Sequence, residues 1–393
     1  MYRIGEQEVE AIRKLFASGQ VFRYGKATEC DRFEKRFAEL LGVRYVRMCN
    51  SGTSALIAAL IGMGVGPGDD VIVPAYTYMA SPMAVLAVGA IPIVTDVDES
   101  LTLCPKDTER RITKRTRAVM PVDMVGLACN MKALVRLAKK KHVSICEDVC
   151  QAVGGSYEGK RLGTFGAAGG FSFNYYKNIT AGEGGCFATD SEDVFKRGSV
   201  AVDPCSYYWE EKDKHIDMHG RFTAWNFRAT EVAGAILNVQ LDYLDEMLDA
   251  MRAHKKAVTA AGTEAGLRSI VNHSPDYECG SHAGFLFETE ELAVRFGELL
   301  KGEEVGSFRP IDTGRHVYTN WDPIMNKQAA HHPSLNPYLL KENRDAKAEY
   351  TTETCARSLD VLKRAVLVGT HPYWPEGRRE KVMEAIGKAA AAL

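Results

Sequence analysis

The sequence of 393 residues lacks long apolar runs and carries no strong excess of charge of either sign. No stretch approaches the roughly eighteen apolar residues that a membrane-spanning helix needs, so we expect no membrane partner. The first residues, Met1–Glu6, lack the apolar core that characterises a secretory signal peptide. We therefore predict a cytoplasmic protein.

Strong basic clusters are also missing. A formal net charge of -2 provides no general attraction for nucleic acid. The basic run Lys139–Lys141 ends a predicted helix, where cations favour the helix dipole. We interpret this run as a solvated helix end and predict no nucleic-acid partner.

Metal-ligand spacings are absent as well. The closest pair among the ten cysteines, Cys146 and Cys150, does not have the spacing of a zinc knuckle or a thioredoxin site. The adjacent His331 and His332 would point to opposite sides of an extended segment. We predict free thiols and no bound metal.

Apolar runs alternate with helical stretches from about residue 45 to residue 190. This alternation implies crossover connections, and hence an α/β fold with a mainly parallel central sheet and helices on both faces. The runs that we expect to form strands are Tyr45–Met48, Val71–Val73, Ile91–Val94, Ala118–Val122, Val143–Cys146, Phe171–Phe173 and Cys186–Thr189.

The chain is long enough to form two domains. We predict a large α/β domain over residues 1–240 and a smaller C-terminal α+β domain over residues 241–393. The helical segment Glu8–Ala17 is expected to pack on the small domain. Segment Pro204–Arg221 is long, polar and aromatic, and we expect it to form a flap on the substrate side.

A turn of small polar residues, Cys49–Ser54, separates an apolar run from an alanine- and leucine-rich helix. Amides and hydroxyls at a helix N-terminus favour an anion such as a phosphate. An ordinary serine or threonine N-cap would leave the same pattern. Because no P-loop lysine follows, a nucleoside triphosphate is disfavoured.

Lys177 lies between a short apolar run and a glycine-rich turn. A lysine amine that is fixed at a strand end and partly desolvated can attack an aldehyde and form a Schiff base. Most lysines beside glycine turns are solvated surface residues. Lys177 alone therefore does not indicate catalysis, and its role has to be inferred together with other motifs of the chain.

The run Val143–Cys146 ends in two acids, and Gln151 follows shortly after. Asp148 at the end of a parallel strand could keep a pyridine nitrogen protonated, as a carbanion-stabilising cofactor requires. A helix cap would explain the same acid. With Lys177 and the anion-binding turn, Asp148 points to pyridoxal phosphate.

These three segments together resemble the DegT/DnrJ/EryC1/StrS family of fold-type I, pyridoxal-phosphate-dependent aminotransferases, over roughly residues 20–390. The resemblance implies that Lys177 forms the Schiff base, that Asp148 faces the pyridine nitrogen and that Gln151 contacts the phenolic oxygen. Tyr78 would stack on the cofactor ring. The phosphate contacts that the resemblance implies are Gly52, Thr53, Ser54 and Ser172.

The resemblance also implies a homodimer with shared active sites, because the family's asparagine corresponding to Asn226 reaches the phosphate of the other subunit. Tyr176 stands where many relatives have a histidine or a small polar residue, and it is a candidate substrate contact. Further candidates are Arg315, His316 and Tyr318, which could bind a carboxylate or sugar hydroxyls. A partly buried strand with a stacked arginine would leave the same pattern.

The implied reaction transfers an amino group from an amino acid, L-glutamate in relatives, to a keto or aldehydo sugar. Segments Phe22–Tyr24 and Thr102–Pro105 resemble the branch that aminates eight-carbon keto-sugar acids. Some relatives replace the lysine by histidine and catalyse dehydration, whereas this chain keeps Lys177. A sugar dehydratase and a non-catalytic pyridoxal-phosphate-binding protein are the alternatives.

Overall fold

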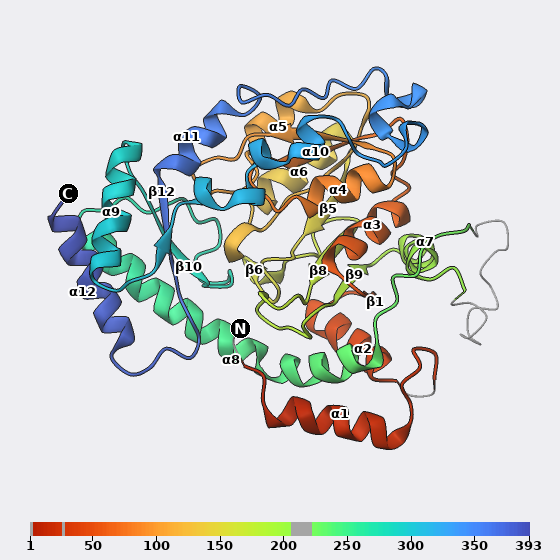
Figure 1. Ribbon diagram of the computed structural model, residues 1–393, viewed down its shortest axis with the longest axis horizontal. Coiled ribbons are helices and arrows are strands. Elements are labelled where there is room, and N and C mark those ends of the chain that lie inside the picture. The colour runs from red at the N-terminus through yellow and green to blue at the C-terminus, as the bar shows by residue number, and fades with distance from the viewer. Residues whose placement is uncertain (1–2, 26–27, 206–221) are drawn as a thin grey trace.

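The computed structural model describes residues 3–25, 28–205 and 222–393 (Figure 1). Within these residues a seven-stranded central sheet has the spatial order β1-β9-β8-β5-β4-β2-β3. The neighbours from β3 through β8 pair in parallel, and β9 runs antiparallel to β8 and β1. This arrangement confirms the predicted mainly parallel α/β fold. The strands are β1 (Tyr45–Cys49), β2 (Asp70–Pro74), β3 (Ile91–Thr95), β4 (Thr116–Val119), β5 (Ser144–Asp148), β8 (Ala168–Ser172) and β9 (Gly185–Thr189).

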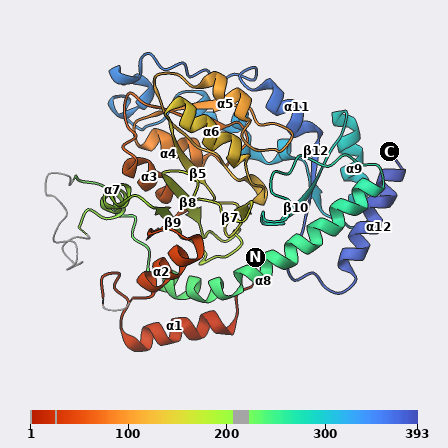
Figure 2. The same cartoon turned by 180° about the vertical axis from the view of Figure 1, so that it is seen from behind.

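Helices lie in front of the sheet and behind it (Figures 1 and 2). Strands β2, β3, β8 and β9 are therefore buried at every position, as their continuous apolar sequences require. The helix α3 is buried almost all round, between β8, β9, α4 and α7. The helices of this domain are α2 (Glu29–Leu41), α3 (Gly52–Gly62), α4 (Ala80–Ala87), α5 (Pro105–Arg111), α6 (Met131–Lys141) and α7 (Glu192–Val202).

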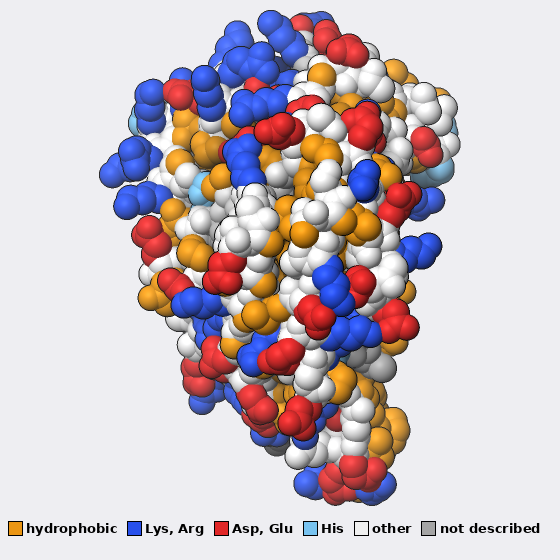
Figure 3. Space-filling model, turned by 90° about the vertical axis from the view of Figure 1, so that its left-hand side faces the viewer, with side chains coloured by type: hydrophobic (Ala, Val, Ile, Leu, Met, Phe, Trp, Pro, Cys, Tyr) orange, Lys and Arg blue, Asp and Glu red, His pale blue; other side chains and the backbone are white. Residues whose placement is uncertain are grey.

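The surface mixes charges of both signs. Figure 3 shows Lys and Arg side chains gathered at the upper end of one face, with acids interspersed over the rest. Lys139–Lys141 occupy the exposed last turn of α6, as predicted for a helix end, and Lys140 Nζ lies 2.8 Å from Glu109 Oε1. No helix of the described segments is both long and apolar enough to cross a bilayer.

The helix α8 (Glu231–Glu264) connects the central sheet to a smaller one (Figure 1). In the described chain the small sheet has the order β10-β12-β11; α8 and α9 pack on it, and α12 packs on these two helices. Phe285, Phe296 and Val366 lie in its apolar core. The elements are β10 (His282–Leu286), α9 (Glu290–Gly302), β11 (Ser307–Phe308), β12 (Ala365–Gly369) and α12 (Arg378–Ala391).

The chain crosses between the two domains more than once. A boundary at residue 240 falls inside the continuous helix α8. Trp321, Ile324 and Tyr350 then pack into the core of the large domain, so part of the segment predicted as small domain belongs there. The remaining elements include β6 (Ser156–Tyr157), β7 (Lys160–Arg161), α10 (Asp322–Met325), α11 (Ala356–Arg364) and 3-10 turns η1 (Met124–Gly126), η5 (Pro310–Asp312), η6 (Gly314–His316), η7 (Tyr318–Asn320), η8 (Pro333–Leu335), η9 (Pro337–Leu339) and η10 (Lys341–Asn343).

The N-terminal helix α1 (Glu6–Ser18) lies beneath the first half of α8, away from the small sheet (Figure 1). The buried carboxylate of Glu8 accepts a hydrogen bond from Gln240 Nε2 at 2.7 Å. The Arg3 guanidinium stacks on Tyr243, 4.0 Å from the ring centroid. The prediction that this helix packs on the small domain is corrected, because its polar partners lie on the part of α8 next to the large domain.

Candidate active site

A cavity of about 600 Å³ opens where the parallel strands of the central sheet end. This edge is where open α/β sheets bind their ligands, and the volume is sufficient for a cofactor together with a small substrate. Of the predicted site residues, the cavity is lined by Gly52, Thr53, Tyr78, Asp148, Gln151, Ser172, Tyr176, Lys177 and His316. Residues that are distant in sequence therefore surround one ligand-sized space.

The start of α3 forms one end of the cavity. Ser51 is the N-cap residue, and its Oγ accepts a hydrogen bond from the Ser54 amide at 3.1 Å. The first-turn amides of Gly52 and Thr53 have no acceptor within the helix, and their positive dipole end favours a phosphate. A Cβ at residue 52 would lie 2.7 Å from Ser172 Cβ, so only glycine permits this close approach.

Ser54 does not line the cavity. Its buried Oγ donates to Asn50 Oδ1 at 2.7 Å and lies 2.9 Å from Ser51 Oγ. Ser51 lines the cavity instead. Ser51 was not among the predicted site residues, although its position immediately before the helix is a signal for an N-cap whose hydroxyl is near a bound anion.

Asp148 ends β5 with its carboxylate fixed from two sides. The Ser81 hydroxyl donates to Oδ2 at 2.6 Å, and the Cys150 amide donates to Oδ1 at 3.1 Å. Thr77 Oγ1 lies 2.7 Å from Ser81 Oγ and extends the network into the loop after β2. The carboxylate is thus held at the cavity wall, and nothing in the sequence indicated Ser81.

Two other acids are buried behind Asp148. Burial, followed by the charge of Glu147, raises the pKa of Asp123 well above its ordinary value. The Asp123 Oδ2 atom is buried without a hydrogen-bond partner in the described chain. Burial and the neighbouring Glu147 carboxylate therefore disfavour the charged form of Asp123.

Lys177 follows β8 in a tight turn, with its amide donating to the Asn174 carbonyl at 2.9 Å. The imidazole of His316 also lines the cavity, and burial, together with the nearby Lys177 charge, lowers its pKa. Its Nδ1 is 2.9 Å from the Thr313 carbonyl, so this nitrogen carries the hydrogen. Tyr78 lies beside it, with ring centroids 5.3 Å apart.

The predicted substrate contacts divide into two groups. Tyr176, which is 81% exposed, and His316 line the cavity. Arg315 is exposed and does not line it. Tyr318 is fully buried, with its hydroxyl 2.8 Å from the Thr351 carbonyl, and it accepts a hydrogen bond from the Cys355 amide. The prediction that Tyr318 contacts substrate is therefore wrong for this structure.

The segments that suggested eight-carbon keto-sugar acids also lie outside the cavity. Arg23 is buried, and its guanidinium pairs with Asp31 at 2.7 Å and Glu34 at 2.6 Å. Segment Thr102–Pro105 is largely buried at the start of α5. These positions do not test the resemblance to the eight-carbon branch, which stays a prediction.

Asn226 lies on the surface outside the cavity, where its Oδ1 accepts a hydrogen bond from the Arg228 side chain at 3.0 Å. This placement leaves its predicted role towards a second subunit open. Most of the predicted flap, residues 206–221, lies outside the described residues. Ser281 and His282 of the small domain line the cavity without any signal in the sequence.

A lysine, a strand-end carboxylate and a helix N-terminus around one cavity are typical of α/β proteins that bind a phosphate-bearing ligand. The model of the DegT/DnrJ/EryC1/StrS aminotransferase family matches residues 2–299. The chain belongs to this family, which confirms the resemblance found in the sequence.

Similar proteins include GDP-perosamine synthase from Caulobacter vibrioides, 39% identical over 223 residues, or 56% of this chain and 57% of that protein. An aminotransferase from Psychrobacter cryohalolentis is similar in structure, with a TM-score of 0.81 at 23% identity over 100% of this chain and 98% of that one. An E coli GDP-4-keto-6-deoxy-D-mannose-3-dehydratase with bound hydrated PLP has a TM-score of 0.79 at 18% identity, covering 98% of each chain.

The matches to the curated relatives are partial. The GDP-perosamine synthases from three organisms are matched over 57%, 61% and 65% of their own length. The solved structures at this level of identity establish the fold alone.

Proposed function

We propose that the protein is a pyridoxal-phosphate-dependent aminotransferase that transfers an amino group from an amino acid to a keto or aldehydo sugar or a sugar derivative. The single observation that carries the proposal is the convergence of Lys177, Asp148 and the start of α3 on one cavity. Membership of an aminotransferase family supports the same reaction.

The residues of the cavity fit the cofactor. Gly52 leaves space at the helix N-terminus that a Cβ would fill, and the Thr53 and Ser172 hydroxyls line the same end. These groups would hold the phosphate. The Asp148 carboxylate would keep a proton on the ring nitrogen, and Gln151 would contact the phenolic oxygen. When bound, pyridoxal phosphate supplies an electron-poor ring that accepts negative charge from a substrate carbon.

Lys177 serves as both nucleophile and proton carrier in this proposal. Its amine would hold the cofactor covalently, and the free amine would carry a proton to and from the donor's α-carbon. His316 and the exposed Tyr176 both line the cavity and are candidate contacts for substrate hydroxyls. L-glutamate is the proposed donor.

The test combines covalent trapping with product analysis. Borohydride reduction of the protein incubated with pyridoxal phosphate, followed by peptide mass spectrometry, is expected to place the cofactor on Lys177. Incubation with 15N-labelled glutamate and a panel of keto sugars, including nucleotide-linked sugars and an eight-carbon keto-sugar acid, is expected to yield one labelled amino sugar. Loss of water from the sugar without transfer of label would instead identify a dehydratase.

We also propose a homodimer with shared sites. Asn226 is exposed outside the cavity, and neighbouring Trp225 is 47% exposed, which leaves an apolar surface for a second copy. Lys177→Ala and Asn226→Ala proteins are each expected to be inactive, whereas mixed dimers regain one intact site. Full activity of Asn226→Ala alone would contradict the shared site.

A further inference from the structure

Val125 has an unfavourable backbone conformation beside the cavity. Its φ of 48° and ψ of 31° lie in the left-handed region, which a β-branched residue rarely adopts. Val125 lines the cavity and lies in η1, in the segment between β4 and α6. Such a conformation persists only where the surrounding contacts fix it.

Three side chains hold the two peptide groups of Val125. On one side, its amide donates to Gln151 Oε1 at 3.1 Å. On the other, Ser281 Oγ donates to its carbonyl at 2.6 Å, and His282 Nδ1 lies 3.2 Å from the same oxygen. Because a carbonyl oxygen can only accept, this contact requires the hydrogen on His282 Nδ1, which also lies 3.1 Å from Ser281 Oγ.

These contacts join the two domains at the cavity. Ser281 and His282 begin the small sheet at β10, whereas Gln151 follows β5 of the central sheet. Gly126 lies so close to this junction that a Cβ would be 2.3 Å from Ser281 Oγ. The Cys279 amide also donates to the Gly126 carbonyl at 3.1 Å, so the start of the small sheet closes over residues 125 and 126.

The amide of Val125 determines which end of Gln151 is available. A backbone N–H can bond only to the oxygen of a glutamine amide, so Gln151 Nε2 is left as the end that can face the cavity. If Val125 relaxed to a common conformation, its amide would turn, and Gln151 would lose the group that fixes its orientation.

We propose that Ser281 and His282 are positioning residues which hold Val125 in the left-handed conformation and thereby orient the Gln151 amide as a hydrogen-bond donor to the phenolic oxygen of pyridoxal phosphate. The proposal rests on the proposed function. It adds that residues of the small domain affect the protonation of the bond between Lys177 and the cofactor. A donor at the phenolic oxygen withdraws negative charge from it, so the adjacent nitrogen holds its proton less tightly.

Other ionisable groups that line the cavity could also affect the proton on the cofactor linkage at Lys177. Burial lowers the pKa of His282 to about 4 and also lowers that of His316, so both imidazoles are neutral at assay pH. The charged groups lining the cavity in the described chain are Asp148, Glu183 and Lys177 itself. None of the planned substitutions removes one of these charges.

The test compares Ser281→Ala and His282→Ala with a matched control, Ser269→Ala. Ser269 bridges to β10 at Phe285, but its buried Oγ has no hydrogen-bond partner in the described chain. In the cofactor-free protein, hydrogen exchange of the amides of residues 124–127 is expected to accelerate about tenfold in the first two variants. The control is expected to exchange like the wild type.

The loaded protein provides a second measurement. The pH midpoint of its visible absorbance change is expected to rise by about one unit in Ser281→Ala and His282→Ala. His282→Asn keeps an N–H near the position of Nδ1 and should restore most of the wild-type midpoint. Val125→Gly removes the cost of the left-handed conformation, so it should reduce the effects of Ser281→Ala on exchange, midpoint and melting temperature.

Two results would overturn the positioning role: exchange and midpoints in Ser281→Ala equal to those of the control, or no rescue by Val125→Gly. A wild-type protein that fails to bind pyridoxal phosphate would overturn the proposed function instead. The exchange measurement on cofactor-free protein still tests the contacts around Val125 in that case.

Discussion

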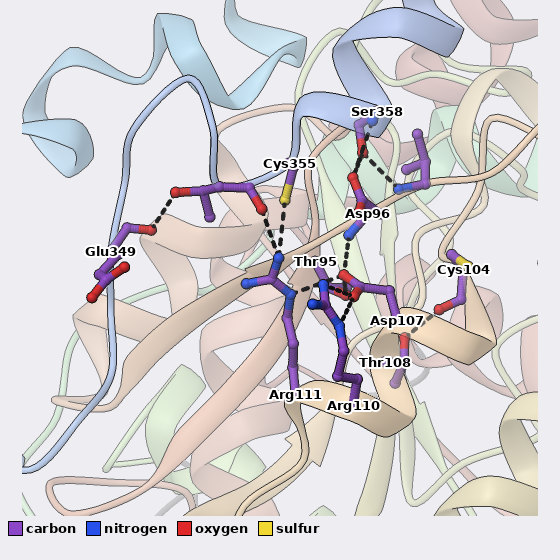
Figure 4. A network of polar contacts seen from close by, with 12 residues as sticks. Thr95, Asp96, Cys104, Asp107, Thr108, Arg110, Arg111, Glu349, Cys355 and Ser358 are labelled. Carbon is purple, nitrogen blue, oxygen red and sulfur yellow. Dashed lines mark hydrogen bonds and ion pairs between the residues drawn. The ribbon is translucent and has the colours of Figure 1, made fainter.

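Two groups of polar residues in the large domain, one around Asp107 and one around Lys177, have different roles. Asp107 of α5 accepts hydrogen bonds from two groups at the end of β3, the Thr95 hydroxyl at 2.7 Å and the Asp96 amide at 2.9 Å. Its carboxylate also pairs with Arg110 and Arg111 (Figure 4). In the cavity, Lys177 Nζ has no hydrogen bond or ion pair to another described residue. Polar groups that hydrogen-bond to one another stabilise the folded structure, whereas a polar group without a protein partner is available to bind a ligand.

The polar cluster around Asp107 also connects distant parts of the chain. The Asp96 carboxylate accepts a hydrogen bond from Ser358 Oγ at 2.6 Å, and Arg111 donates to the Thr354 carbonyl at 2.6 Å (Figure 4). These contacts attach the start of α11 to the edge of the central sheet. Their loss is expected to reduce stability, while loss of cavity residues is expected to reduce activity.

The largest expected effect is that of Lys177→Ala. Turnover should fall to background, together with the visible absorbance that pyridoxal phosphate gains on attachment, because no other described lysine lines the cavity. The melting temperature should change by less than about 3 °C, since the amine has no partner to lose. The control is Lys256→Ala, at an 83% exposed side chain; full turnover in Lys177→Ala would contradict the assignment.

Asp148→Asn should lower kcat by about 100-fold, because a neutral amide cannot keep the ring nitrogen protonated. The hydrogen bond from Ser81 can persist, so folding should be retained. Steady-state kinetics and a melting curve of the same preparation check this expectation. A variant with unchanged kcat would place the essential acid elsewhere.

Asp107→Asn should instead lower the free energy of unfolding by about 2 kcal/mol and leave kcat unchanged. Burial acts to raise the pKa of Asp107, but the hydrogen bonds from Asp96, Thr95 and the arginines outweigh it, so the net pKa is lowered. Urea unfolding measures the stability. A large loss of activity in the folded variant would remove the distinction between the two clusters.

The pH dependence of the Asp107 contribution follows from the sign of its shift. The folded pKa lies below the unfolded value of 3.8, so the stabilisation is complete above that value and is lost as the pH falls through the folded pKa. The stability difference between wild type and Asp107→Asn should therefore shrink below about pH 4. A difference that grew in acid would contradict this sign.

The smallest expected effect is that of Tyr318→Phe. Removing the buried hydroxyl leaves the Cys355 amide without its acceptor, which should cost about 1 kcal/mol of stability. Kinetic constants should remain those of the wild type, because Tyr318 does not line the cavity. A clear rise in KM for the acceptor would restore the original prediction of a substrate contact.

Local patterns in the sequence were sufficient to predict that three residues at the ends of strands or the start of a helix lie together at one edge of the sheet. Lys177, Asp148 and Gly52 each stand at a strand-to-turn or turn-to-helix transition, and parallel strands bring such transitions to one edge of the sheet. Ser81 and Ser281 could not be predicted, because their partners are brought close only by tertiary folding.

The failures have a similar cause. Tyr318 lies in a segment of mixed aromatic and basic residues, and that composition is equally suitable for a binding surface or for a buried hydroxyl with backbone partners. The predicted domain boundary was placed by a change of pattern near residue 240, although the helix continues through it.

The continuity of α8 limits how the small domain can move. This helix of 34 residues is about 50 Å long, and it packs on α1 and α2 near one end and on α12 and β10 near the other. A rigid rod anchored in both domains resists a simple hinge rotation. Closure over a substrate would therefore have to bend the rod or be confined to the loops at the cavity mouth, and the scattering profile should change little when substrate binds.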